Sequence, residues 1–246
     1  MLDIKEKVII VTGSSKGIGA TIAKTLAAKG GYVVINYANA TADAENVVAD
    51  IINNGGKAIA IKADVSKPEE VKHLFDVAIS HFGKIDILIN NAGIAIYKFI
   101  KDTTDEDFDR IFNINVKGIF NTMREAATRL ADGGRIINFS SSVTRLMLPA
   151  YATYSATKAA VEQMTKVFAK EIGSRKITVN SVSPGPVNTE LFTQGKTEET
   201  ISRLASMSAF NRIGETDDIA NVILFLVSEE AQWITAQNIG VNGGFA

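Results

Sequence analysis

The sequence predicts an α/β fold, a doubly wound parallel sheet of seven strands with helices on both faces, as in Rossmann-like proteins. Short runs rich in β-branched residues alternate with longer helical patterns along the chain, and most of these runs are continuously apolar. Continuous apolar runs are typical of parallel strands that are buried on both faces. No linker or low-complexity stretch divides the 246 residues, so we expect a single domain over residues 1–246.

Each of the first six predicted strands is followed by a helical pattern, which favours a parallel sheet. The predicted strands are 8–11, 33–35, 58–61, 85–89, 135–139, 177–182 and 238–241. The predicted helices are 17–29, 41–54, 68–82, 105–131, 154–173 and 216–228. Pro68 suits the first turn of the third helix, with Ser66 as its N-cap. Residues 190–212 read as an insertion before the last helix, and we expect them to form a lid over a site.

The composition excludes several kinds of functional site. The chain has no cysteine, which rules out disulfides, thiolate zinc sites, iron–sulfur clusters and cysteine nucleophiles. Its two histidines, His73 and His81, share one charged helical pattern without a third ligand, so we expect surface histidines and no metal site. The net charge of −1 favours neither a nucleic-acid partner nor an acidic membrane.

The sequence also indicates where the protein works. Residues 1–7 lack the basic and then apolar order of a signal peptide. No apolar run approaches the roughly 20 residues that span a bilayer. We therefore expect a soluble, cytoplasmic protein without membrane contacts.

A glycine-rich loop follows the first predicted strand and opens the first predicted helix. Its sequence is Thr12-Gly13-Ser14-Ser15-Lys16-Gly17-Ile18-Gly19, with glycines at the spacing Gly-x-x-x-Gly-x-Gly. Such glycines permit a tight turn and let the backbone approach a pyrophosphate at the helix N-terminus. A purely structural glycine turn is the alternative, but the strand before and the helix after it favour a dinucleotide cofactor.

The end of the second predicted strand bears on the choice between NAD and NADP. An acidic residue there would bind the ribose 2′-hydroxyl of NAD. This chain instead has Asn36-Tyr37-Ala38-Asn39, and Lys16 in the loop could meet a 2′-phosphate. The sequence therefore predicts a preference for NADP(H), with NAD(H) also possible, although Lys16 could equally be a solvated loop residue.

Tyr154 and Lys158 lie four residues apart in a predicted helix and therefore share one of its faces. A nearby ammonium favours the phenolate, so we expect Lys158 to lower the pKa of Tyr154 and to make it an acid–base group. A half-buried tyrosine beside a lysine that extends to solvent is the alternative.

Further motifs follow successive strands in a consistent order. They are Asp64-Val65 after the third strand, Asn90-Asn91-Ala92-Gly93 after the fourth, Asn115 in the fourth helix, Ser141 after the fifth strand, and Pro184-Gly185 after the sixth. Together with the glycine loop, Tyr154 and Lys158, they resemble the short-chain dehydrogenase/reductase family over essentially the full length. The chain is most similar to 3-oxoacyl-carrier-protein reductases and related bacterial ketone reductases.

This resemblance implies a role for each residue of a Ser-Tyr-Lys-Asn catalytic set. Ser141 would hydrogen-bond the substrate carbonyl, and Tyr154 would donate the proton. Lys158 would hold the nicotinamide ribose, and Asn115 would hold a water that links Lys158 to solvent.

The resemblance also implies cofactor contacts. Asp64 and Val65 would flank the adenine. The ribose and the nicotinamide side would be lined by Asn91, Ala92 and Gly93, and the carboxamide end by Pro184, Gly185, Val187 and Thr189. Ordinary turns after strands are the alternative for the segments at 90–93 and 184–185.

The substrate is less defined by the sequence. Reductases of carrier-bound substrates usually present basic residues near the active-site mouth, and the family's spacing assigns these positions to Asp132 and Arg175. An acidic Asp132 disfavours an acyl-carrier-protein partner without excluding it. We expect an apolar pocket for a small ketone or alcohol, walled by Val143, Thr144, Arg145, Leu146, Met147, Leu148, Tyr151, Leu191 and Phe192.

Three functions are consistent with these patterns. The favoured one is an NADPH-dependent carbonyl reductase that interconverts a ketone and a secondary alcohol. The alternative is a 3-oxoacyl-carrier-protein reductase of fatty acid synthesis, and a remote third is a non-catalytic NADP-binding protein. The resemblance further implies a homotetramer built from the 105–131 and 154–173 helices and the C-terminal segment.

Overall fold

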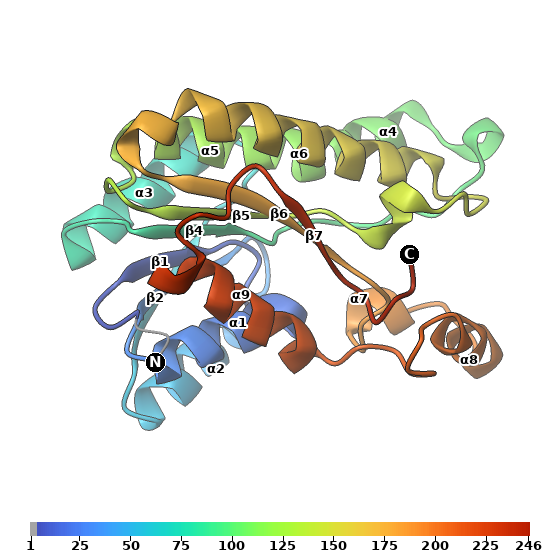
Figure 1. The fold of residues 1–246 in the computed structure, drawn as a ribbon, viewed down its shortest axis with the longest axis horizontal. Coiled ribbons are helices and arrows are strands. Elements are labelled where there is room, and N and C mark those ends of the chain that lie inside the picture. Colours follow the sequence, from blue (N-terminus) through green and yellow to red (C-terminus); the bar gives the residue numbers. More distant parts are fainter. Residues whose placement is uncertain (1–3) are drawn as a thin grey trace.

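The central sheet of the protein consists of parallel strands only. The computed structural model describes residues 4–246, and within this range seven strands pair in the order β3-β2-β1-β4-β5-β6-β7 (Figure 1). The strands are β1 Val8–Val11, β2 Tyr32–Tyr37, β3 Lys57–Lys62, β4 Ile87–Asn90, β5 Arg135–Phe139, β6 Thr178–Pro184 and β7 Asn238–Val241. The predicted sheet is therefore confirmed.

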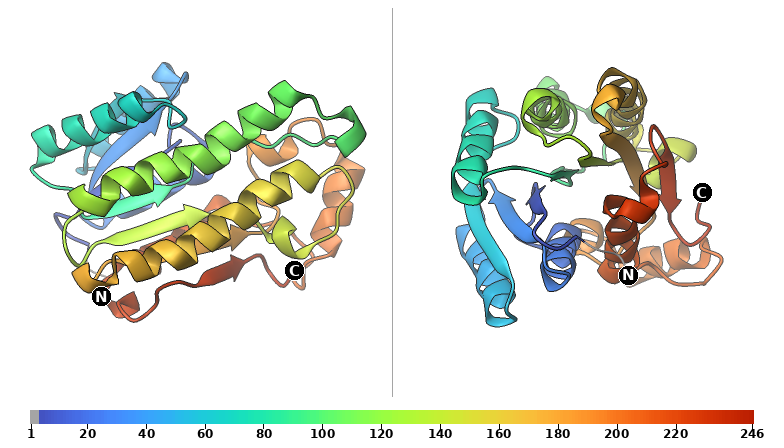
Figure 2. Two further views of the ribbon diagram at one scale, coloured as in Figure 1. Left: turned by 90° about the horizontal axis from the view of Figure 1, so that it is seen from above. Right: turned by 60° about the vertical axis from the view of Figure 1, so that its left-hand side comes forward.

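Helices cover both faces of this sheet (Figures 1 and 2). They are α1 Gly17–Ala28, α2 Thr41–Asn53, α3 Pro68–Phe82, α4 Asp105–Phe112, α5 Gly118–Arg129, α6 Ala152–Glu171, α7 Glu190–Thr193, α8 Glu198–Ser206 and α9 Thr216–Val227. Leu26 of α1 and Ile223 of α9 pack into one core, and Phe75 of α3 and Val161 of α6 pack into the other. The sheet is thus buried on both faces, as its apolar strands predict.

The strand order changes direction between β1 and β4. These strands are neighbours in the sheet, with Ile10 beside Leu88, although β2 and β3 separate them in the chain. At such a switch point the connections leave to opposite faces, which opens a crevice beyond the carboxyl ends of the strands. The glycine loop after β1 and the segment after β4 both border this crevice.

Two local predictions differ from the structure. The predicted helix 105–131 is interrupted by a π-helical turn, Asn113–Lys117, between α4 and α5. The predicted N-cap of α3 is wrong, because Lys67 occupies the cap position without a side-chain hydrogen bond. The Ser66 hydroxyl instead donates to Asp64 Oδ1 at 2.7 Å. A short polar side chain can bond several neighbours, and sequence alone does not select among them.

The segment 190–212 contains α7 and α8 and lies beyond the carboxyl ends of the strands (Figure 1). It is an insertion between β6 and α9, as the sequence predicts. No helix within residues 4–246 is both long enough and apolar enough to cross a membrane.

Gly19 offers a test of how tightly α1 packs on the loop before it. A Cβ atom at this position would lie 2.6 Å from Asn91 Nδ2 and 2.7 Å from the Gly13 carbonyl oxygen. We expect Gly19→Ala to lower the free energy of unfolding by about 1–3 kcal/mol, the usual cost of overpacking. Chemical denaturation measures this change.

Gly173→Ala is the matched control, since a Cβ at Gly173 meets nothing within 4 Å. It should unfold close to the wild type. Equal stability of the two variants would contradict the packing described for Gly19.

Candidate active site

The glycine loop after β1 adopts a conformation that requires glycine at two positions. Gly13 and Gly17 have φ angles of +61° and +57°, in the left-handed region. A Cβ on Gly13 would also lie 2.8 Å from Ala92 Cα. α1 begins at Gly17, so its unpaired N–H groups and positive dipole end face the crevice. This arrangement fits a phosphate group.

Two buried or partly buried amides hold the loop in place. Asn36 Oδ1 accepts a hydrogen bond from the Gly13 N–H at 3.2 Å. Asn91 Nδ2 donates to the carbonyl oxygens of Thr12 and Gly13 at 3.0 and 2.9 Å. The segments after β1, β2 and β4 are thereby joined at the switch point, and Asn36 has a structural role that its sequence position did not reveal.

One half of the crevice has the length and lining of a dinucleotide site. It has a volume of about 1320 Å³ including its open side. The predicted cofactor residues that line it are Gly13, Ser15, Lys16, Gly17, Ile18, Ala38, Asp64, Val65, Asn91, Ala92, Gly93 and Thr189. Arg110 and Ile114 line it as well, and the sequence analysis missed both. The sequence pattern that could have indicated them is their spacing of four residues on a helix, but this spacing is too common to predict a binding site.

Two predicted cofactor residues do not line the crevice. Tyr37 packs against the core on the α1, α2 and α9 side of the sheet. Gly19 is buried beneath the loop, where it permits the close contact with Asn91 described above. Tyr37 therefore lies beside the cofactor half of the crevice rather than in it, and Gly19 supports the loop from behind.

Lys16 forms an ion pair across the crevice. Its Nζ lies 2.5 Å from Glu190 Oε2, and both side chains are mostly exposed. This hydrogen bond raises the pKa of Lys16, so its ammonium stays charged. Lys16 is thus a cation at the cofactor half of the crevice that already has a carboxylate partner in the 190–212 segment.

The other half of the crevice contains three of the four predicted catalytic residues. Ser141 follows β5 directly, and α6 carries Tyr154 and Lys158. The three residues line one pocket, and the Ser141 and Tyr154 side chains are hydrogen-bonded. The predicted residues Pro184, Gly185 and Val187 line the same pocket. Asn91 and Gly93 line both halves, so the two halves form one continuous crevice.

The protonation of Tyr154 differs from the sequence-based expectation. Burial raises the pKa of Tyr154 to about 12, and the hydrogen bond with Ser141 offsets only part of this effect. Lys158 Nζ lies 5.7 Å from the centre of the Tyr154 ring and donates to the Phe139 carbonyl oxygen at 2.9 Å. The expectation that Lys158 lowers the tyrosine pKa is therefore wrong here, because desolvation of the phenolate is the larger effect.

The surroundings of Lys158 change the pKa of its own ammonium group. It is buried, and burial lowers the pKa of its ammonium to about 8. The charged form is disfavoured because burial removes it from water, and among the described residues the Phe139 carbonyl oxygen is the one acceptor of a hydrogen bond from Nζ. The Tyr154 phenol is thus protonated at pH 7, and the pKa of Lys158 on the same helix is about 8.

Asn115 lies in the π-helical turn and is fully buried. Its side chain accepts from the Ile94 N–H and donates to the Ile94 carbonyl, both at 2.9 Å. It also donates to Thr157 Oγ1 at 3.2 Å. Asn115 does not line the pocket; it joins the segment after β4 to α6 directly behind Lys158. π-turns are frequent at functional sites, and the sequence showed only a helix here.

The predicted apolar wall is correct in part. Val143, Leu148, Tyr151, Leu191 and Phe192 line the pocket. The predicted residues Thr144, Arg145, Leu146 and Met147 do not, and Met147 is fully exposed. The lining stops at Val143, within the short 3₁₀ turn Ser142–Arg145, and resumes at Leu148.

Aromatic rings missed by the sequence analysis complete the pocket wall. The rings of Tyr97 and Tyr151 are tilted by 36° with 4.4 Å between their centres, and Tyr97 meets Tyr154 edge-on at 6.0 Å. Phe245, near the end of the chain, lines the opposite part. These residues lie far apart in the sequence, so only the fold brings them together. The pocket is consequently more aromatic than expected.

Asp132 and Arg175 form an ion pair with each other rather than facing the pocket. Arg175 Nε lies 2.7 Å from Asp132 Oδ1. Asp132 precedes β5, and Arg175 ends a 3₁₀ turn before β6. Ser141 follows β5. The ion pair therefore lies at the amino-terminal ends of the strands, away from the site of its own chain, which lies at their carboxyl ends. The expectation that Asp132 lies at the mouth of that site is wrong. The negative charge of Asp132 therefore gives no reason to disfavour an acyl-carrier protein at the site of its own chain.

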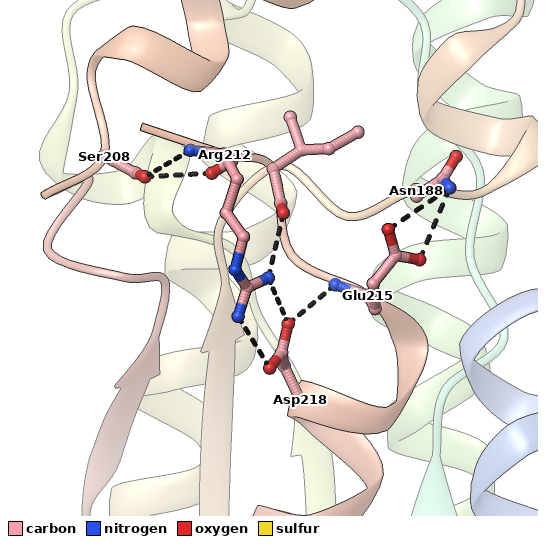
Figure 3. A network of polar contacts seen from close by, with 6 residues as sticks. Asn188, Ser208, Arg212, Glu215 and Asp218 are labelled. Carbon is pink, nitrogen blue, oxygen red and sulfur yellow. Dashed lines mark hydrogen bonds and ion pairs between the residues drawn. The ribbon is translucent and has the colours of Figure 1, made fainter. Parts of the chain in front are cut away.

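A polar network anchors the far end of the 190–212 segment (Figure 3). Arg212 binds both carboxylate oxygens of Asp218 in α9, at 2.6 and 3.0 Å. Asp218 also accepts from the Glu215 N–H at 2.7 Å, which caps α9. The Ser208 hydroxyl donates to the Arg212 carbonyl at 2.9 Å. The segment is thus fixed at the end that leads into α9.

No group of three metal-ligating side chains occurs within residues 4–246. His73 and His81 are both exposed on α3.

Comparison with known proteins identifies the family. A family profile described as enoyl-(acyl carrier protein) reductase matches residues 13–246. A short-chain type dehydrogenase/reductase of Picea abies is 46% identical over 97% of this chain and 92% of its own length. The chain belongs to the short-chain dehydrogenase/reductase family. The predicted family, fold and enzyme class are thereby confirmed, and the protein is an oxidoreductase.

Two further similarities bear on the cofactor. An NADPH-dependent aldehyde reductase-like protein, chloroplastic, of Arabidopsis thaliana is 45% identical over 99% of this chain and 96% of its own length. A crystal structure of a short-chain dehydrogenase from Burkholderia cenocepacia in complex with NADP has a TM-score of 0.94 and 37% identity, covering 98% of each chain.

Lys158→Met tests the burial of the ammonium. Because folding lowers the pKa of Lys158, wild-type Lys158 destabilises the fold below about pH 8 and ceases to do so as the pH rises towards 10.5. We expect the variant to be more stable than the wild type by about 1–2 kcal/mol at pH 7, after loss of the bond to Phe139. Urea denaturation at pH 7 and pH 9.5 should show this advantage shrinking with pH.

Activity should be lost in the same variant. An advantage that stays constant between the two pH values would show that the ammonium is not desolvated in the folded protein.

Proposed function

We propose that this protein is an NADPH-dependent carbonyl reductase that interconverts a carbonyl compound and an alcohol. The observation that carries the proposal is the hydrogen-bonded pair of Ser141 and Tyr154 hydroxyls in an apolar pocket that continues into the dinucleotide crevice. Two hydroxyl donors beside an apolar pocket suit a carbonyl oxygen on which negative charge develops.

The protein's own part in the reaction is to hold the carbonyl and to move a proton. When bound, the nicotinamide cofactor supplies the hydride. Ser141 donates a hydrogen bond that orients the carbonyl oxygen, and Tyr154, neutral at pH 7, donates its proton to that oxygen. Lys158 lies close enough to stabilise the resulting phenolate, and its pKa of about 8 suits the return of a proton.

Asn115 is proposed to support the return of this proton. It is buried behind Lys158 and holds the Ile94 backbone through both of its side-chain atoms. This fixed position suits a water molecule between Lys158 and solvent, and it keeps the catalytic helix in register with the segment after β4.

The cofactor proposal rests on charge in the crevice and on relatives. No acid lies at the end of β2 to bind a ribose 2′-hydroxyl, whereas Lys16 is a charged donor at the same end of the crevice. The Arabidopsis and Burkholderia proteins are described with NADPH and NADP. We therefore infer a preference for NADP(H), held by the crevice residues named above.

The substrate is proposed to be an apolar or aromatic ketone or aldehyde. The pocket has a volume of about 920 Å³ including its open side. Its walls carry Tyr97, Tyr151 and Phe192, with Leu148 and Leu191. Rings of this kind favour flat, apolar substituents through dispersion and stacking. The 190–212 segment contributes Leu191 and Phe192, which supports its role as a lid.

Oligomerisation and location are proposed from the sequence and the surface. Phe120 of α5 and Val167 of α6 are about half exposed, beside Met164, on the helix face where the family resemblance implies subunit contacts. Burial of such a patch in a homotetramer would remove apolar area from water. A cytoplasmic location remains the proposal for the cell.

Tyr154→Phe tests the proton donor. Removal of the phenol oxygen should lower kcat by roughly 1000-fold, within the range of general acid catalysis, while the apolar ring keeps its packing. NADPH binding, followed by fluorescence titration, should remain near the wild-type value. Full turnover in this variant would exclude the mechanism.

The wild type should be assayed with simple ketones, aldehydes, aromatic ketones and a carrier-linked 3-oxoacyl thioester, each with NADPH and NADH. A strong preference for the carrier-linked thioester would favour the carrier-protein reductase instead. No turnover with any of these substrates would contradict the proposed function.

Lys16→Ala tests the cofactor preference. Loss of the cation should raise the Kd for NADPH about tenfold, or roughly 1.4 kcal/mol, and leave the Kd for NADH little changed. Lys24→Ala is the control, because Lys24 is also exposed on the α1 side but pairs with Asp50. An equal loss for both cofactors would show that Lys16 does not recognise the 2′-phosphate.

A further inference from the structure

The two hydroxyls of the proposed site come from different elements of the fold. Ser141 stands in the connection after β5, whereas Tyr154 and Lys158 stand on α6. Their relative positions must hold to within about 0.5 Å for efficient catalysis. Side-chain contacts between the connection and the helix must therefore supply this precision.

Glu162 makes two of these contacts with a single oxygen atom. Its Oε1 accepts from Ser140 Oγ at 2.7 Å and from Thr144 Oγ1 at 2.8 Å. Ser140 and Thr144 stand on either side of Ser141 in the connection. Glu162 lies one helical turn after Lys158 on α6 and does not line the pocket. One carboxylate on the catalytic helix thus holds the chain both before and after the catalytic serine.

The alternative partners of the two hydroxyls are more distant. Ser140 Oγ lies 3.4 Å from the Lys158 carbonyl oxygen, and Thr144 Oγ1 lies 3.1 Å from the Ser141 carbonyl oxygen. A hydroxyl has one proton to donate, so the shorter distances favour Glu162 as acceptor in both cases. Hydrogen bonds to a carboxylate are also about twice as strong as those between neutral groups.

Glu162 and Lys158 act on the same connection from successive turns of the helix. Lys158 Nζ donates to the Phe139 carbonyl oxygen, two residues before Ser141. Glu162 accepts from the residues at 140 and 144. Ser155 Oγ of α6 also donates to the Val143 carbonyl at 3.2 Å, and the Tyr154 and Ser141 side chains are hydrogen-bonded to each other. Glu162 is the only one of these groups that holds two positions of the connection.

We propose that Glu162 is a positioning residue that holds the Ser141 hydroxyl in register with Tyr154. This inference rests on the proposed function, because it assigns the geometry of the same site. Glu162 lines neither half of the crevice. It acts through Ser140 and Thr144, and its loss frees the connection on both sides of Ser141.

The experiment compares Glu162→Ala with Glu162→Gln in the full-length protein. The Gln amide oxygen can still accept both hydroxyls, whereas Ala accepts neither. Per NADPH-binding site, kcat of Glu162→Ala should fall about 10- to 100-fold, as expected for a misplaced catalytic group. Glu162→Gln should retain most of kcat, and the Kd for NADPH should be unchanged in both. Glu45→Ala, an exposed glutamate on α2, is the control and should behave as the wild type.

Thr144→Val tests the route of the effect. On its own it should lower kcat less than Glu162→Ala does, because Ser140 still binds the carboxylate. Combined with Glu162→Ala it should add little, since residues of one network are not additive. Fully additive losses would overturn the proposal that the two residues act together.

Hydrogen exchange separates this inference from the proposed function. The N–H groups of the 142–146 turn should exchange faster in Glu162→Ala than in the wild type, and Glu162→Gln should resemble the wild type. This readout needs no substrate. Unchanged exchange in Glu162→Ala, or a kcat equal to that of the wild type, would overturn the positioning role. Absence of wild-type turnover with faster exchange in Glu162→Ala would overturn only the proposed function.

Discussion

A buried ammonium group joins the helix and the strand that form the catalytic half of the crevice. Lys158 of α6 donates a hydrogen bond to the Phe139 carbonyl at the end of β5 and forms no ion pair with the residues that the structure describes. Desolvation lowers its pKa to about 8, which costs stability at neutral pH. Ser141 is only two residues beyond Phe139, so this contact also determines how far the serine stands from Tyr154. The chemistry proposed for the site depends on it.

The dinucleotide half of the crevice depends on close backbone contacts rather than on charge. Gly13 approaches Ala92 so closely that a side chain would collide, and Asn36 and Asn91 bind the backbone of the same loop. The segments after β1, β2 and β4 therefore behave as one rigid frame at the switch point of the sheet. Lys16 lies at the edge of this frame and pairs with Glu190, which connects the cofactor half to the 190–212 segment that contributes Leu191 and Phe192 to the pocket.

Much of this arrangement was predictable from the sequence. The apolar runs predicted seven parallel strands, and the glycine spacing predicted the loop that precedes α1. Tyr154 and Lys158 share a helix face, as a spacing of four requires. The residues that the sequence did not predict correctly depend on contacts between distant segments. Tyr97 and Phe245 line the pocket from different loops. Asp132 pairs with Arg175 at the ends of the strands that lie away from the pocket.

The sequence by itself determined the order of strands and helices and the glycine loop, because these follow from local spacing and burial pattern. The side chains proposed for catalysis were also named from the sequence, through its resemblance to a known family. The tertiary structure alone decided their electrostatics. The pKa of Tyr154 is raised rather than lowered because burial of the phenolate outweighs the hydrogen bond with Ser141, and the Lys158 ammonium donates to a backbone carbonyl instead. It also decided that Glu162 reaches both sides of Ser141, since β5 and α6 meet only once the sheet has formed. Desolvation and packing are properties of the assembled fold, so a local sequence pattern cannot predict them.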